Sequence, residues 1–222
     1  MKYTHIIFDL DGTFAHTALD LLGTLGRITQ RFSLKPISMD QFGQIIGHGA
    51  KAMIARSFEL NDLELDEKLH NELFDEFLKD YAQNIANETY IFDGLLDAMT
   101  KLESDGFGFS ICTNKTERMA IKLIETLGVM DRFKSLTGGD TFPFKKPDER
   151  HLIETARLAG TEVTNCIMIG DSITDISAAK NANIPSIAVT FGYSDMPVNE
   201  LGANLVIDHY SKLVDAVGEI NA

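Results

Sequence analysis

Two aspartates, Asp9 and Asp11, follow the first apolar run of the chain in the segment FDLDGT. Carboxylates in this arrangement can bind a hard cation, attack an electrophile or transfer a proton. The ordinary alternative is a polar turn in which both side chains cap backbone amides. A calcium-binding loop that starts at Asp9 is excluded, because its sixth residue would be Phe14 where glycine is needed and its twelfth Asp20 where glutamate is usual.

Two later segments of the chain carry groups that could bind an anion: a hydroxyl and an amide at 113–114, and a lysine at 146. Thr113 and Asn114 follow an apolar run and precede a helical pattern, so they can hold an anion, although a plain helix N-cap is the simpler alternative.

Lys146 lies before Pro147, which restricts it to an extended backbone just ahead of a predicted helix. A cation at the positive end of a helix is unfavourable unless an anion is nearby. A solvated lysine in a loop is the alternative.

Two more carboxylates, Asp171 and Asp175, follow the apolar run 166–170. Capping of the next helix is again the ordinary alternative. Each of the four segments is a weak indication by itself, but each lies at or just beyond the carboxyl end of a predicted strand. These ends meet at one edge of a parallel sheet, where α/β proteins bind their ligands.

The combined residue types favour Mg²⁺-dependent phosphoryl transfer. Oxygen ligands for the ion would come from Asp9, Asp11 and Asp171. Positive charge and donors for a phosphate would come from Lys146 and the edge Thr113–Asn114. The sequence contains no GxxxxGK[ST] segment, so a nucleotide cradle of that type is not predicted.

Alternating strands and helices predict the fold that positions these residues. The expected strands are the runs 3–10, 107–113, 166–170, 186–190 and 205–207, with a short sixth near 134–137. Helical spacing between them predicts an α/β fold, a Rossmann-like parallel sheet with helices on both faces.

The stretch from Thr17 to about Ala86 breaks this alternation, because its apolar residues have helical spacing throughout. One long helix is expected from Leu63 to Ile85. We therefore predict an inserted α-helical domain at 16–87 and an α/β core domain formed by 1–15 and 88–222. An extra helical layer on one domain is the alternative.

Composition excludes several classes of protein. The 222 residues include 20 Lys and Arg against 33 Asp and Glu, a formal charge of −13, which argues against nucleic-acid binding. No apolar run reaches the roughly 18 residues that span a membrane, and no signal peptide is predicted, so a cytoplasmic protein is expected. Cys112 and Cys166 lie in apolar runs and are expected to be buried, reduced thiols.

Four segments resemble the motifs of the haloacid dehalogenase superfamily of phosphatases, in order and at suitable spacing: DLDGT at 9–13, CTN at 112–114, KP at 146–147 and GDSITD at 170–175. The helical insertion resembles the first type of α-helical cap in that superfamily. The nearest subgroup is similar to phosphoglycolate phosphatases. Two departures concern the subgroup only: His16 occupies a position where aspartate is usual, and the second proline often found after KP is missing.

The resemblance implies a mechanism and a cofactor, Mg²⁺. Asp9 would be the nucleophile that forms an aspartyl-phosphate. Asp11 would protonate the leaving oxygen and later activate water, and its backbone carbonyl would join Asp9 and Asp171 as metal ligands.

Lys146 would offset the charge on the transferring group, and Thr113 and Asn114 would hold its oxygens. Asp175 would contact Lys146 rather than the substrate and so hold the lysine in its orientation. The substrate is expected to be a small phosphorylated metabolite, and the protein a monomer or homodimer with no nucleic-acid or membrane partner.

Substrate choice is expected in the cap, where the segment IGHGAK places Gly47, His48 and Lys51 before a helix. An interhelical turn with solvated side chains is the alternative for this loop.

Three rival activities use the same residues differently. A phosphosugar mutase would return the phosphate to another hydroxyl, and Lys51 is the basic candidate for binding a second phosphate. Dehalogenation is disfavoured, because it needs neither the acid Asp11 nor the metal ligand Asp171. A non-catalytic phosphometabolite-binding regulator would be expected to lack Asp9, Asp11 or Lys146, and all are present.

Overall fold

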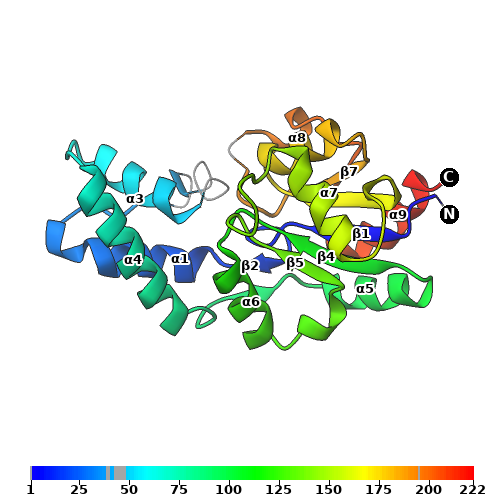
Figure 1. The fold of residues 1–222 in the computed structure, drawn as a ribbon, viewed down its shortest axis with the longest axis horizontal. Coiled ribbons are helices and arrows are strands. Elements are labelled where there is room, and N and C mark those ends of the chain that lie inside the picture. The colour runs from blue at the N-terminus through cyan, green and yellow to red at the C-terminus, as the bar shows by residue number, and fades with distance from the viewer. Residues whose placement is uncertain (1, 39–40, 43–48, 195) are drawn as a thin grey trace.

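The computed structural model describes residues 2–38, 41–42, 49–194 and 196–222. It consists of a sheet covered by helices and a separate group of helices that projects from one end of it (Figure 1). The projecting group comes from the N-terminal third of the chain, coloured blue to cyan, whereas both chain ends lie on the far side of the sheet.

The sheet has six parallel strands in the order β5-β4-β1-β6-β7-β8. Their bounds are β1 (His5–Phe8), β4 (Gly108–Cys112), β5 (Ser135–Thr137), β6 (Cys166–Gly170), β7 (Ser186–Val189) and β8 (Leu205–Ile207). Each falls within or close to a run that the sequence predicted as a strand, including the short sixth. The parallel α/β sheet is therefore confirmed.

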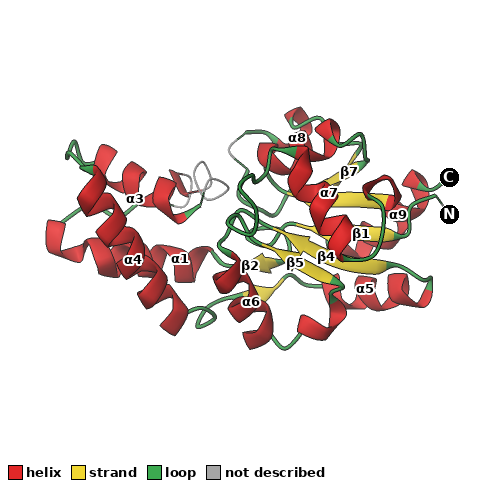
Figure 2. Cartoon of the chain, viewed as in Figure 1, coloured by secondary structure: helices red, strands yellow, loops and turns green. Residues whose placement is uncertain are grey.

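Helices cover both faces of this sheet (Figure 2). On one face, α5 (Leu95–Ser104), α6 (Glu117–Thr126) and α9 (Leu213–Ile220) pack with Ile6 and Phe8 of β1. On the other, α7 (Glu149–Leu158) and α8 (Ile173–Asn181) pack with Ile7. Alternate residues of β1 thus enter different cores, which is why Ile6, Ile7 and Phe8 are all apolar.

The projecting helices are α1 (Ala18–Thr29), α3 (Ala50–Glu59) and α4 (Glu67–Gln83). Arg27 of α1 pairs with Asp80 of α4, and Arg31, in the 3₁₀ turn that follows α1, pairs with Glu76 of α4. The long helix is shorter than the predicted span from Leu63 to Ile85, so both predicted ends were wrong. It begins after Asp66, whose carboxylate accepts the Leu69 backbone N–H as an N-cap, a signal that periodicity does not contain.

A two-stranded ribbon connects the projecting helices to the sheet. It pairs β2 (Ala15–His16) with β3 (Tyr90–Ile91) in antiparallel fashion. The carboxylate of Asp20 in α1 also accepts backbone N–H groups of Glu88 and Thr89, which fastens the two connections together. Strands of two residues are too short for a periodic pattern, so the sequence did not predict this ribbon.

Short 3₁₀ helices complete the fold: η1 (Gln30–Phe32), η2 (Met130–Arg132), η3 (Val163–Asn165), η4 (Val198–Glu200) and η5 (Tyr210–Lys212). Cys112 and Cys166 are buried free thiols, as predicted. Among the helices that the structure describes, none combines the length and apolar character that a membrane crossing requires.

Candidate active site

The loop that follows β1 is held against the end of β6. The backbone N–H of Asp9 donates to the Ile169 carbonyl, so the ladder between the strands continues one residue beyond β1. Gly12 has a φ of 84°, and a Cβ at that position would collide with the Asp171 carboxylate. Glycine therefore allows the FDLDGT loop to pass directly over Asp171. The next residue, Thr13, donates its hydroxyl to Asp171 at 3.2 Å.

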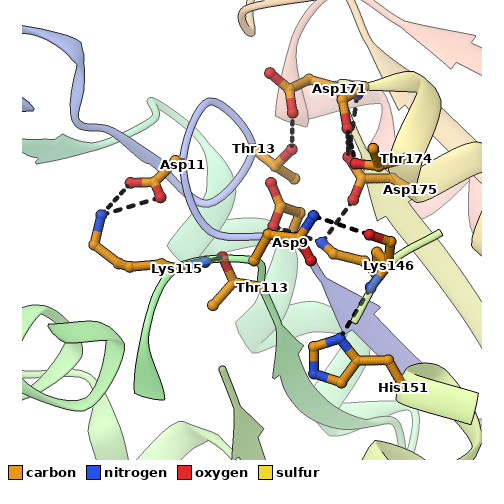
Figure 3. A network of polar contacts seen from close by, with 12 residues as sticks. Asp9, Asp11, Thr13, Thr113, Lys115, Lys146, His151, Asp171, Thr174 and Asp175 are labelled. Carbon is orange, nitrogen blue, oxygen red and sulfur yellow. Dashed lines mark hydrogen bonds and ion pairs between the residues drawn. The ribbon is translucent and has the colours of Figure 1, made fainter. Parts of the chain in front are cut away.

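Lys146 joins Asp9, which directly follows β1, to Asp175 in the first turn of α8 (Figure 3). Its Nζ lies 2.7 Å from Asp9 Oδ1 and 2.6 Å from Asp175 Oδ1, and its side chain is 1% exposed. Burial by itself lowers the pKa of Lys146, but attraction to Asp175 and Asp9 outweighs that effect and raises it. The lysine is therefore a fixed, fully charged group beside Asp9.

Asp175 is held from its own helix as well. Its Oδ2 accepts the backbone N–H and the hydroxyl of Ser172, which forms a capping box at the start of α8. Asp175 therefore both caps its helix, through Oδ2, and binds Lys146, through Oδ1.

Three buried carboxylates, Asp9, Asp171 and Asp175, have oxygens within 4.8 Å of one another. Burial raises the pKa of Asp9 to about 7 despite the opposing effect of Lys146. Burial and the neighbouring charges of Asp9 and Asp175 raise the pKa of Asp171 well above its usual range. A single lysine does not balance this charge, and a divalent cation held by oxygens would.

The donor set fits Mg²⁺, because it consists of oxygens alone. Asp175 accepts from Lys146 on Oδ1 and from Ser172 on Oδ2, and Asp171 likewise accepts the Thr13 hydroxyl on Oδ1 and the Tyr193 backbone N–H on Oδ2. The side-chain ligands predicted from the sequence, Asp9 and Asp171, both belong to the cluster, and their choice over Asp175 stays a prediction. The carboxylate of Asp11 is not part of the cluster, so only its backbone carbonyl, which the resemblance implied as a ligand, remains a candidate.

Asp11 points away from Asp9 and toward a second lysine (Figure 3). Lys115 Nζ lies 2.7 Å and 3.0 Å from its two carboxylate oxygens, and Thr17 donates its hydroxyl to Oδ1 at 2.6 Å. Lys115 and Thr17 were not predicted from the sequence as site residues. A lysine directly after Thr113–Asn114 was the available signal, since it lies at the same strand edge as the predicted phosphate-binding residues.

Thr113 and Asn114 are at the predicted place, at the end of β4. The Thr113 hydroxyl accepts the backbone N–H of Lys115 at 3.2 Å, and the Asn114 amide donates to the Lys146 carbonyl at 3.1 Å. Asn114 thereby connects the β4 edge to the Lys146 segment, whereas Thr113 stabilises the turn of its own segment. A small pocket between these elements is lined by Asp9, Asp11, Thr113, Asn114, Lys115, Lys146, Ser172 and Thr174.

The predicted specificity loop is described only at its end. Gly47 and His48 lie outside the described residues, so their role stays a prediction. Lys51 lies in α3, and its Nζ donates to Asn71 at 2.8 Å and lies 5.1 Å from the centroid of the Phe74 ring. Its ammonium group is therefore directed toward α4.

Taken together, a Rossmann-like core, a helical insertion after the first strand, and carboxylates and lysines at the carboxyl edge define an α/β enzyme of the phosphoryl-transfer class. The chain belongs to the haloacid dehalogenase-like hydrolase family, which matches residues 6–189. The resemblance found in its sequence motifs is therefore confirmed.

Curated relatives agree with this assignment. The chain is 42% identical to a phosphoglycolate phosphatase of Agrobacterium fabrum over 96% of this chain and 91% of the relative. It is 41% identical to a phosphoglycolate phosphatase of Mesorhizobium japonicum over 96% of this chain and 94% of the relative. The predicted enzyme class, a phosphatase, is confirmed by these relatives and the family.

A solved structure shows the same fold over the full length. The crystal structure of a predicted phosphoglycolate phosphatase from Haemophilus somnus superposes with a TM-score of 0.91, at 22% identity, over 98% of this chain and 99% of that one. A β-phosphoglucomutase from Clostridium difficile gives a TM-score of 0.81 at 21% identity, over 98% and 96% of the two chains. Phosphatases and a mutase therefore share this architecture, and the fold does not separate the two activities.

Proposed function

We propose that this chain is a Mg²⁺-dependent phosphoglycolate phosphatase that works through a phosphoenzyme on Asp9. The observation that carries the proposal is the Lys146 ammonium, held between Asp9 and Asp175 at the carboxyl edge of the sheet. It places a permanent positive charge beside a carboxylate in the pocket that Thr113 also lines. Two phosphoglycolate phosphatases at 41% and 42% identity support the choice of substrate.

In the first step, an Asp9 oxygen attacks the phosphorus and the bond to the ester oxygen breaks. Lys146 offsets negative charge on the transferring phosphoryl group, and Thr113 with Asn114 orients its oxygens. Asp11 must first leave Lys115 and take up a proton from solvent; it then gives this proton to the leaving oxygen, which departs as an alcohol. Bound Mg²⁺, held by Asp9 and Asp171, would lower the repulsion between the carboxylate and the phosphate dianion.

In the second step, Asp11 is the base. It takes a proton from a water molecule, whose oxygen forms a bond to phosphorus as the bond to Asp9 breaks. Inorganic phosphate is released and both aspartates return to their starting states. Asp175 contacts no substrate in this scheme and acts by positioning Lys146.

We further propose that the helices of the insertion, residues 16–87, act as a cap that moves relative to the core. The supporting observation is that the chain crosses between the two parts through two short segments, which the β2–β3 ribbon and Asp20 tie together. Such a connection allows rotation of the cap as a unit. Closure would exclude water from the small pocket around Asp9.

The test is turnover of a panel of phosphate esters. The panel contains phosphoglycolate, sugar phosphates, nucleoside monophosphates and pyrophosphate, each measured with Mg²⁺ and with excess chelator. We expect phosphoglycolate to give the highest kcat/KM and the chelator to abolish turnover. Asp9→Asn protein is the control for contaminating phosphatases. Undiminished turnover in chelator would contradict the metal assignment, and a mutase would convert a sugar phosphate into its isomer without releasing phosphate.

A further inference from the structure

Two cavities meet at Asp11, Asn114 and Lys115. The first is the small pocket around Asp9 and Lys146, and the second is a cavity of about 170 Å³ between the core and the projecting helices. The same three residues line both. An ester whose phosphate lies beside Asp9 must therefore extend its leaving group past Asp11 and Lys115 into the larger cavity.

The wall of the larger cavity is mainly apolar on the side of the projecting helices. It includes Leu21, Met53, Phe74, Phe77, Leu78 and Tyr81. An anionic group that enters such a cavity loses hydration and needs a charged partner there. The cations among the residues that line it are Lys51, Lys115 and Lys145.

Lys115 differs from the other two in burial and in surroundings. Its side chain is 7% exposed, whereas Lys51 and Lys145 are exposed residues. Its Nζ is paired with Asp11 and also lies 4.6 Å from the centroid of the Tyr81 ring, which α4 contributes from the insertion. The Tyr81 ring holds the ammonium group at the boundary of the two cavities, so the cation stays in place when its carboxylate partner is exchanged.

We propose that Lys115 is a specificity-determining residue that binds a carboxylate on the leaving group, and that this carboxylate replaces Asp11 as its partner. This proposal rests on the proposed function and names the residue that recognises the substrate class. Asp11 now points to Lys115 and Thr17 rather than to Asp9. Loss of the Lys115 contact would free Asp11 to turn toward the ester oxygen, so a substrate without a carboxylate would leave the acid in its resting position.

Binding to an inactive protein tests this without any turnover. In an Asp9→Asn background with Mg²⁺, calorimetry compares phosphoglycolate with 2-hydroxyethyl phosphate, which has the same length and a neutral end. We expect phosphoglycolate to bind at least about tenfold more tightly, as for one charged hydrogen bond in a partly buried site. Adding Lys115→Met should remove that preference, whereas Lys145→Met, a lysine change at the same cavity, should preserve it.

Two results would overturn the proposal: no preference for phosphoglycolate in the starting protein, or a preference that survives Lys115→Met, including the case in which both ligands lose affinity equally. Lys115→Gln keeps a hydrogen-bonding group for Asp11 and should also abolish the preference, which covers the case in which the methionine variant fails to fold. Turnover by the wild-type enzyme is scored separately. A Lys115-dependent preference without turnover would refute the proposed phosphatase and leave the carboxylate site standing.

Discussion

Lys146 and Asp175 form an ion pair at 2.6 Å in which each side chain is 1% exposed. Lys146 is committed in the same way to Asp9, so removal of Asp175 leaves a buried lysine with one carboxylate fewer. Because the same buried lysine is held by Asp175 and faces Asp9, this pair links the stability of the fold to the geometry of the proposed active site.

We expect Asp175→Asn to lower the free energy of unfolding by about 1–3 kcal/mol, because Lys146 and Ser172 each lose a charged hydrogen-bond partner. It should also lower kcat more than tenfold, because Lys146 loses its orientation beside Asp9. Denaturant titration and aryl phosphate turnover measure the two effects. Asp148→Asn is the matched control, since it makes the same charge change in an exposed pair with Arg150 and keeps an N-cap. It should leave stability close to that of the wild-type protein, because water screens an exposed ion pair. Equal effects of the two substitutions would contradict the role given to Asp175.

The two aspartates of the first motif should differ on substitution. Asp9→Asn should abolish both turnover and phosphoenzyme, because it removes the proposed nucleophile. Asp11→Asn should slow hydrolysis of the intermediate, while an aryl phosphate with a good leaving group still phosphorylates Asp9. Acid quenching of each variant with labelled substrate measures the covalent phosphate. Label retained by Asp9→Asn would show that another group is the nucleophile.

The strands and the residues at their carboxyl ends were predictable from the sequence, because the spacing and type of apolar residues within one strand are local properties. The apolar runs before Asp9 and Asp171 predicted strands, and the carboxyl edge of a parallel sheet brought those two residues together as expected. The direction of each side chain was not predictable in this way. Asp9 and Asp11 are neighbours in sequence, yet Asp9 faces Lys146 and Asp11 faces Lys115.

The missed features depend on contacts between distant residues. Lys115 is distinguished by Tyr81, which the chain supplies from another helix, and no local pattern contains that contact. The β2–β3 ribbon is likewise fixed by Asp20 and by pairing across the insertion. These features arise when the insertion packs on the core, which is why motif spacing did not indicate them.

Metal binding should depend on Asp171. Burial and two neighbouring carboxylates raise the pKa of Asp171, so the metal-free fold contains repulsion that Mg²⁺ would relieve. We expect Mg²⁺ to raise the Tm of the wild-type protein, since a ligand that binds the folded state stabilises it. Asp171→Asn should raise the Tm of the metal-free protein and abolish the response to Mg²⁺. Calorimetric scans with and without the ion measure both, and an unchanged response would remove Asp171 from the metal site.

His5 should make stability depend on pH independently of the active site. His5 is the first residue of β1, at the end of the strand away from the predicted metal ligands. The residue is 5% exposed, and its Nε2 lies 2.8 Å from the Ser110 hydroxyl. Burial, with a smaller contribution from Lys134, lowers the pKa of His5 from 6.5 to about 4. The unfolded chain therefore binds one more proton than the folded chain between these values, so this contribution to stability is complete above pH 6.5 and is lost as the pH falls toward 4.

This single group can change the free energy of unfolding by at most about 1.4 kcal/mol per pH unit. His5→Gln retains a hydrogen-bonding group near Ser110 and cannot titrate, so it isolates the effect from other ionisable groups. Urea unfolding of both proteins at pH 7 and pH 5 gives the difference in slope. We expect the free energy of unfolding of the wild-type protein to fall by up to about 2 kcal/mol more than that of the variant between pH 7 and pH 5. The difference begins near pH 6.5, where His5 of the unfolded chain takes up its proton. Parallel losses in the two proteins would mean that His5 is protonated in the folded state or titrates normally there.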